Sequence, residues 1–196
     1  MENNKSAFNT NKLTFLGVML SLTIVFVALT ALPTTSASMA LLIFIPTIVT
    51  SIIQGPKLGA ILGFFAGTVT LLRALLAPAS PLDYLFINPL VSILPRIFIG
   101  IVPYYINAGI KKLFKSESIS LLLAGASGAL VNTGLVILAL YIIYCDKIVE
   151  ISTQFGIGNT FKAFALFLIT SNCLIEASVA GIATASVVKI YGRIKK

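Results

Sequence analysis

Long apolar runs, each close to the length that spans a bilayer, limit most strongly what this chain folds into. Of its 196 residues 58% are hydrophobic and only 10% are charged, whereas soluble domains carry about 25% charged residues. A helix needs about 20 mainly apolar residues to cross a membrane. Six runs qualify, at approximately residues 13–32, 39–54, 58–76, 89–110, 119–144 and 161–190. We therefore expect an all-α membrane protein, a single integral membrane domain over residues 1–196 with six transmembrane helices.

Two of the six runs depart from the usual length. Run 39–54 is short and lies between two turn-forming stretches, residues 33–36 and 55–57, which predicts a strongly tilted or partly inserted helix. Run 161–190 is longer than a bilayer is thick, so we expect residues 187–196 to project into the aqueous phase.

Lysine and arginine gather on one predicted side of the membrane. The first, third and fifth connections hold only Lys147, with Lys162 at the start of the sixth run. Ten cations lie in the other connections and at the ends: Lys5, Lys12, Lys57, Lys111, Lys112, Lys115, Lys189, Arg193, Lys195 and Lys196. By the positive-inside rule both termini and the second and fourth connections are cytoplasmic. The net charge of +8 thus reports topology rather than a nucleic-acid surface.

The chain lacks the residues that nucleotide hydrolysis, metal binding and acid–base catalysis require. The chain has no phosphate-binding G-x-x-x-x-G-K-[ST] loop, no histidine, six acidic residues and two cysteines without metal-ligand spacing. We therefore expect no catalytic residue, no metal and no cofactor, and a protein that binds, conducts or assembles rather than an enzyme. If the chain pumps, partner subunits must supply the ATP hydrolysis.

Two arginines lie within predicted spans, where a charge costs about 3 kcal/mol or more unless it is paired, hydrated or snorkelling. Arg96 lies about seven residues into the fourth run. It either clamps an anion in a cavity open to the outside or snorkels to the outer headgroups. The same two interpretations apply to Arg73, which lies near the outer end of the third run, where snorkelling is easy.

Uncharged and acidic polar residues also occur in the last two runs. Asn132 lies near the middle of the fifth, and its amide must satisfy several hydrogen bonds. Asn172 and Glu176 are four residues apart and share a helical face. Asn132 either bonds a neighbouring helix or contacts a ligand. Asn172 and Glu176 either bond each other, face a neighbouring helix or contact a ligand.

Small residues recur at four-residue spacing and allow helices to approach closely. One stripe is Gly59, Gly63 and Gly67, a second is Ala177, Gly181 and Ala185, and Gly17 with Ser21 marks the first run. Such stripes pack the spans against one another or dock another membrane subunit. The pair on the first run suits an external partner best.

The third connection, residues 77–89, contains three prolines and apolar side chains. It is either a lid over a cavity or a loop on the membrane interface.

Three segments resemble a known family: Gln-Gly-Pro-Lys-Leu-Gly-Ala-Ile-Leu-Gly at 54–63, Thr-Leu-Leu-Arg-Ala-Leu at 70–75 and Phe-Ile-Asn-Pro-Leu-Val-Ser-Ile-Leu-Pro-Arg-Ile-Phe-Ile-Gly at 86–100. They are similar to the substrate-binding S components of energy-coupling factor (ECF) transporters. The Asn-Pro-Leu-Val-Ser-x-Leu-Pro-Arg run resembles the branch assigned to pantothenate.

The resemblance implies a vitamin-binding subunit in the bacterial plasma membrane. It implies partnership with a membrane coupling subunit and two cytoplasmic ATPases, and delivery of the vitamin by toppling within the membrane. The docking motif of the family falls on Gly17 and Ser21, although this chain departs from the usual Ala-rich form. By family analogy the pantothenate site contains Arg96 and Asn132. From the chemistry of their side chains we expect further contributions from Arg73, as a second candidate for the carboxylate, from Asn88 and Tyr84, which could close the lid, and from Asn172.

Two alternatives remain beside this interpretation. The first is an S component for another vitamin, such as folate, niacin or a thiamin precursor; an arginine in the cavity favours an acid. The second is a stand-alone secondary transporter, which needs an ion site and for which only Glu176 is available. Uptake that persists without the coupling ATPases would favour the second.

Overall fold

The computed structural model describes residues 10–30, 42–79, 81–114 and 116–194, except for the side chains of Pro81 and Asn172. In these ranges the chain forms helices and no strand, which confirms the expected all-α class. The elements are α1 (Thr10–Leu29), α2 (Phe44–Gln54), α3 (Pro56–Leu76), η2 (Pro81–Ile87), α4 (Pro89–Ser92), α5 (Leu94–Ile99), α6 (Val102–Phe114), α7 (Glu117–Gln154), α8 (Phe161–Leu168), η3 (Ile169–Cys173) and α9 (Leu174–Ile194).

The six predicted apolar runs all correspond to helices. Among the described residues, five helical stretches are long and apolar enough to cross a membrane: Thr10–Leu29, Pro56–Leu76, Pro89–Phe114, Glu117–Gln154 and Phe161–Ile194. The second run contains only the 11 residues of α2, a length of about 16 Å, which is about half the thickness of the hydrocarbon core. Residues 39–41 of that run and the turn at 33–36 lie outside the described residues.

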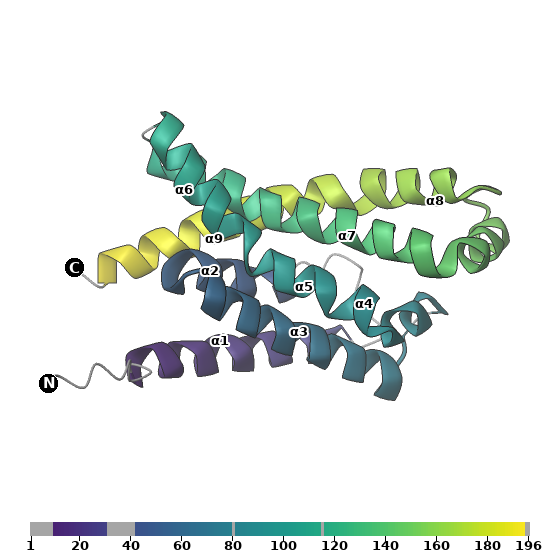
Figure 1. The fold of residues 1–196 in the computed structure, drawn as a ribbon, viewed down its shortest axis with the longest axis horizontal. Helices are drawn as coiled ribbons and strands as arrows, with labels where there is room; N and C mark the ends of the chain where they lie inside the picture. Colours follow the sequence, from purple (N-terminus) through teal and green to yellow (C-terminus); the bar gives the residue numbers. More distant parts are fainter. Residues whose placement is uncertain (1–9, 31–41, 80, 115, 195–196) are drawn as a thin grey trace, which may run out of the picture.

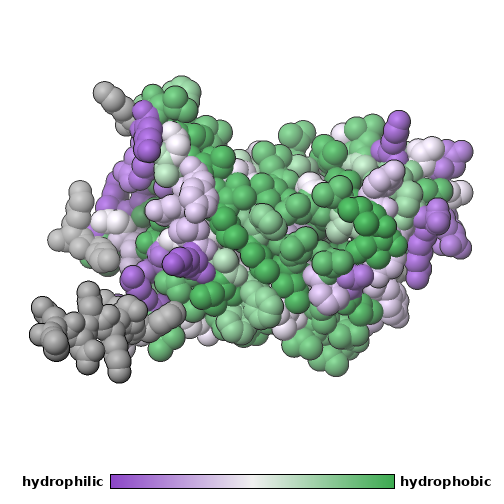
Figure 2. Space-filling model, viewed as in Figure 1, coloured by the Kyte–Doolittle hydropathy of each residue, from purple (hydrophilic) through white to green (hydrophobic). Residues whose placement is uncertain are grey.

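The long helices lie roughly parallel, so that the molecule has two polar ends and an apolar middle (Figure 1). The start of α1, the end of α9 and the α6–α7 connection lie at one end, and η2 and the α7–α8 connection lie at the other. Figure 2 shows hydrophobic side chains over the middle and hydrophilic ones at both ends. We call the first end inner and the second outer, following the expected orientation. Among the expected inner cations, Lys5, Lys115, Lys195 and Lys196 lie outside the described residues.

The fourth run is not one helix but three, α4, α5 and α6. Pro89 is the first residue of α4, Pro95 the second of α5 and Pro103 the second of α6. Proline lacks an N–H donor and clashes with the preceding turn, so it is tolerated in the first turn of a helix and interrupts a longer one. The three prolines therefore divide the span into short helices.

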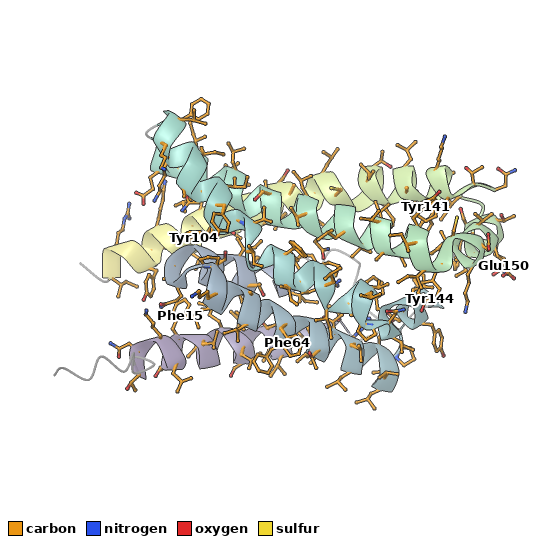
Figure 3. The ribbon with its side chains drawn as sticks, viewed as in Figure 1. Phe15, Phe64, Tyr104, Tyr141, Tyr144 and Glu150 are labelled. Carbon is orange, nitrogen blue, oxygen red and sulfur yellow. The ribbon has the colours of Figure 1, made fainter. Side chains whose placement is uncertain are left out.

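The fifth run continues past its expected end at residue 144 to Gln154. Tyr144 has φ −131° and ψ 24°, which kinks α7, and the segment after it turns across the outer end, where Glu150 lies (Figure 3). The apolar cluster of Leu140, Ile148 and Phe164 is buried there. The outer end of the molecule is thus closed partly by α7 itself.

The glycine stripe on α3 packs against α5. A Cβ at Gly63 would collide with the carbonyl oxygen of Arg96, and one at Gly67 would lie 2.6 Å from the Cα of Ile93. Gly59 and Gly100 face each other in the same way. Internal packing, one of the two predicted uses of such stripes, is therefore confirmed for α3. This contact fixes the height of α5, which carries Arg96, relative to α3.

Candidate functional site

A cavity of about 180 Å³ lies in the outer half of the bundle, enclosed by residues of five elements and by Phe44 at the start of α2. A single water molecule needs only about 10–15 Å³, so the cavity has room for a small organic molecule. The lining residues are Phe44, Leu82, Leu85, Phe86, Arg96, Asn132, Thr133, Val136, Ile137, Leu140, Phe164, Leu168 and Glu176.

Along α7, and along the stretch from α8 to α9, the polar lining residues lie deeper than the apolar ones. Helix α7 runs outward, so Asn132 and Thr133 lie below Leu140. The stretch from α8 to α9 runs inward, so Glu176 lies below Phe164. The cavity therefore has a polar floor, completed by Arg96, under apolar walls and a cover from η2. A ligand with polar groups and an apolar body fits this division.

Pro95 explains the position of the Arg96 side chain. In a continuous helix the carbonyl of Val91 would accept from the N–H of residue 95, but proline has none. The guanidinium Nη1 of Arg96 donates to this carbonyl oxygen at 3.1 Å. The bond turns the arginine back towards the N-terminus of α5, the direction that helical side chains favour, and so places it at the cavity.

Arg96 is buried but only partly satisfied. It is 6% exposed, its guanidinium carbon lies 5.7 Å from the ring centroid of Phe44 and 5.5 Å from that of Phe86, and its Nε has no hydrogen-bond partner. Within the described ranges no carboxylate lies within 4.0 Å of it. Because a buried charge without a counter-ion is costly, this arrangement suits an anionic ligand better than snorkelling.

The amide of Asn132 is a second incompletely bonded group at the cavity. Asn132 is 7% exposed, and its Oδ1 has no hydrogen-bond partner. Beside it, the hydroxyl of Thr133 donates to Oε2 of Glu176 over 3.5 Å, which is a long bond. A buried acceptor without a donor costs about 1–3 kcal/mol, so a ligand that donates to Asn132 recovers this energy.

Arg73 is not at the cavity, because an acid holds it. Its guanidinium makes two bonds to Asp83, at 2.5 and 3.2 Å, and Asp83 also accepts from the N–H of Ala79 at 2.7 Å. We call this group the Arg73–Asp83 clasp. It ties α3 to η2, which supplies Leu82, Leu85 and Phe86 to the cavity. The third connection thus covers the cavity, one of its two predicted uses, and Arg73 is bonded to Asp83 instead of lining the cavity.

Asn88 and Tyr84, two further predicted site residues, are not among the described residues that line the cavity. The Oδ1 of Asn88 accepts from the N–H of Leu90 at 3.0 Å, which caps α4. Tyr84 is 59% exposed and is not a lining residue. The side chain of Asn172 lies outside the described part of the chain. Glu176, for which the sequence leaves a helix contact and a ligand contact open, lines the cavity.

Comparison with known proteins agrees with these observations. A family model described as the ECF transporter substrate-specific component matches residues 11–188, a range that contains every residue lining the cavity. No curated protein matches the chain.

Proposed function

The chain belongs to the substrate-specific components of ECF transporters, and on that premise we propose that its cavity captures pantothenate from outside the cell. Members of this family are multi-pass membrane subunits that bind the substrate, while the ATP is hydrolysed by partner subunits. We propose that these partners are a coupling subunit in the membrane and two cytoplasmic ATPases. The loaded chain then topples in the membrane of a bacterial cell and releases the vitamin inside.

The observation that carries the choice of ligand is the buried guanidinium of Arg96, which has an unbonded Nε and no carboxylate within 4.0 Å in the described chain. Guanidinium groups bind carboxylates through two parallel charge-assisted hydrogen bonds. An acid is therefore the best ligand for this floor. Neutral thiamin precursors lack a carboxylate that could bind Arg96.

Pantothenate has the other groups that the cavity favours. Its amide N–H and two hydroxyls are donors for the unbonded Oδ1 of Asn132. Its geminal dimethyl group is apolar and suits walls such as Val136, Leu140 and Phe164. Niacin is an acid without hydroxyl or amide donors, so it leaves Asn132 unsatisfied. Folate is a much larger acid than a cavity of about 180 Å³ suits.

Mass spectrometry of the ligand retained by the purified chain tests this proposal. The chain is purified in detergent from cells grown with pantothenate, and the bound molecule is released by denaturation. We expect pantothenate in wild type and none in Arg96→Ala. If folate, niacin or a thiamin precursor is released instead, that molecule and not pantothenate is the ligand.

We propose further that the coupling subunit docks on α1 at Gly17 and Ser21. Within α1 only Thr23 and Val27 are buried, and a Cβ at Gly17 would meet no atom within 4 Å. The hydroxyl of Ser21 donates to the carbonyl of Gly17 at 2.9 Å, so its polarity is satisfied within the helix. The glycines of α3 are already covered by α5, whereas this pair is open to a partner.

A bulky residue on α1 separates docking from binding. We expect Gly17→Leu to abolish ATP-dependent pantothenate uptake in reconstituted vesicles while pantothenate affinity stays within about twofold, because the side chain blocks close helix approach. Gly109→Leu is the matched control, since Gly109 is also open to its surroundings, on α6. Equal uptake by the two variants would place the docking surface elsewhere. Uptake by wild type without any coupling subunits would favour a stand-alone transporter.

A further inference from the structure

Glu176 is an acid at the cavity to which the proposed function gives no role. Two other acids have cationic partners, Asp83 with Arg73 and Glu117 with Lys111. Glu176 lies within a membrane-spanning helix and faces the cavity. Its hydrogen bond to a described residue is the long contact donated by the hydroxyl of Thr133. An acid at this depth is expensive unless something compensates for it.

The nearest cationic group on the floor does not pair with it. Arg96 and Glu176 attract each other, but in the described ranges their nitrogen and oxygen atoms do not approach within the 4.0 Å of an ion pair. A purely structural pair in a low-dielectric site would close to contact, because the cost of burying both charges is repaid only with close geometry. Two opposite charges instead face one cavity with space between them.

The backbone places Glu176 there by a specific device, the π turn η3. In a continuous α-helix, at about 100° per residue, Phe164 and Glu176 would project about 120° apart. A π turn accommodates one additional residue, which reduces this angle to about 20°. Phe164, Leu168 and Glu176 consequently all line the cavity. Without the π turn, the acid would face a neighbouring helix or lipid.

We propose that Glu176 is a second polar anchor for the substrate, accepting from its donor groups while Arg96 holds its carboxylate. The inference rests on the proposed function, since it concerns the same cavity. It defines the substrate class as small acids that carry hydroxyl, amide or amine donors at a distance from the acid group. Pantothenate meets this definition, because its carboxylate and its two hydroxyls lie at opposite ends of the molecule.

Titration calorimetry with pantothenate and its analogue lacking the terminal hydroxyl tests the role of Glu176. Glu176→Gln keeps the shape of the side chain but loses the charged acceptor, and we expect an affinity loss of about 10- to 100-fold, the range for hydrogen bonds to charged groups. The deoxy analogue should bind wild type more weakly by a similar factor. Glu176→Gln should discriminate little between the two ligands, since residue and hydroxyl act as a pair.

Glu150→Gln is the matched control, because Glu150 is exposed at the outer end beyond the kink (Figure 3) and loses the same charge. It should bind both ligands as wild type does. If Glu176→Gln still prefers pantothenate over the deoxy analogue as strongly as wild type does, Glu176 does not accept from the terminal hydroxyl and the inference is wrong. This holds even if the substitution also changes the stability of the protein.

Failure of the proposed function gives a different result. If wild type binds no pantothenate, the same comparison is made on the molecule released from the purified chain. An acid with hydroxyl, amide or amine donors whose retention falls in Glu176→Gln supports the inference and contradicts only the choice of pantothenate. A released molecule without such donors, or no released molecule, contradicts the inference as well.

Discussion

Two arginines lie in the outer half of this membrane protein, and their surroundings differ. Arg73 makes two bonds to Asp83, and the two side chains are 15% and 11% exposed. Arg96 is 6% exposed, donates to one backbone carbonyl, lies against two phenylalanine rings and keeps an unbonded Nε. The first charge is neutralised by the chain itself. The second is held in position and left for something else to neutralise.

The difference shows how to distinguish a structural from a ligand-binding charge within a membrane. Both arginines are costly at this depth unless they are compensated. In the Arg73–Asp83 clasp the carboxylate of Asp83 compensates the charge of Arg73. The clasp also ties η2, which covers the cavity, to α3. The cavity compensates Arg96 only partly, and we propose that an anionic ligand supplies the remaining compensation.

The largest effect is expected from Arg96→Ala, which should weaken pantothenate binding by about 100-fold or more, because truncating one partner of a buried charge pair costs about 2–5 kcal/mol. Arg96→Lys keeps the charge without the planar fork, so it should recover only part of the affinity. Equilibrium binding of radiolabelled pantothenate to purified variants measures both losses. Unchanged affinity in Arg96→Ala would remove Arg96 from the site.

A smaller effect on binding is expected from Gly63→Ala. Its Cβ would collide with the carbonyl of Arg96 and lie 3.1 Å from the Cα of Ile97, so α3 and α5 must separate. Overpacking of this kind costs about 1–3 kcal/mol, and we expect thermal unfolding in detergent to occur several degrees lower, with about tenfold weaker binding. Gly17→Ala, which meets no atom within 4 Å, should change neither. Equal unfolding temperatures would show that the α3–α5 contact does not position Arg96.

The smallest effect is expected from the clasp. Arg73→Ala and Asp83→Ala should each weaken pantothenate binding by about 3- to 10-fold, because η2 is held less firmly over the cavity while its ligand contacts remain. The double variant should bind no worse than the weaker single one, since the two residues act as one unit. Titration calorimetry on the three variants tests this. A loss as large as that of Arg96→Ala would mean that Arg73 itself contacts the ligand.

Much of the fold could be predicted because lipid imposes simple demands. Apolar runs of bilayer length become helices whatever their neighbours, so the sequence predicts all six. The lengths of two differ from the prediction: α2 is shorter than run 39–54, and α7 continues past the kink at Tyr144. The glycine stripe on α3 indicated close packing, and the structure identifies α5 as its neighbour. The sequence shows three prolines in the fourth run. Whether they divide the span into three helices depends on which groups donate hydrogen bonds to the backbone carbonyls that the prolines leave without a partner.

The site was less predictable, because side-chain partners and helix rotation decide it. The sequence suggested Arg96 and Asn132, and both line the cavity. It did not pair Arg73 with Asp83, since the two meet only after the chain turns between α3 and η2. It did not place Glu176 at the floor, because one additional residue in a π turn rotates everything that follows by about 100°.

The measurement that tests the central claim most directly compares pantothenate with pantothenol, in which a hydroxymethyl group replaces the carboxylate, on wild type and Arg96→Ala. If Arg96 binds the acid, wild type should prefer pantothenate by about 100-fold, and Arg96→Ala should bind the two ligands with affinities within about threefold of each other. Equal affinity of wild type for both ligands, or an undiminished preference in Arg96→Ala, would contradict the account.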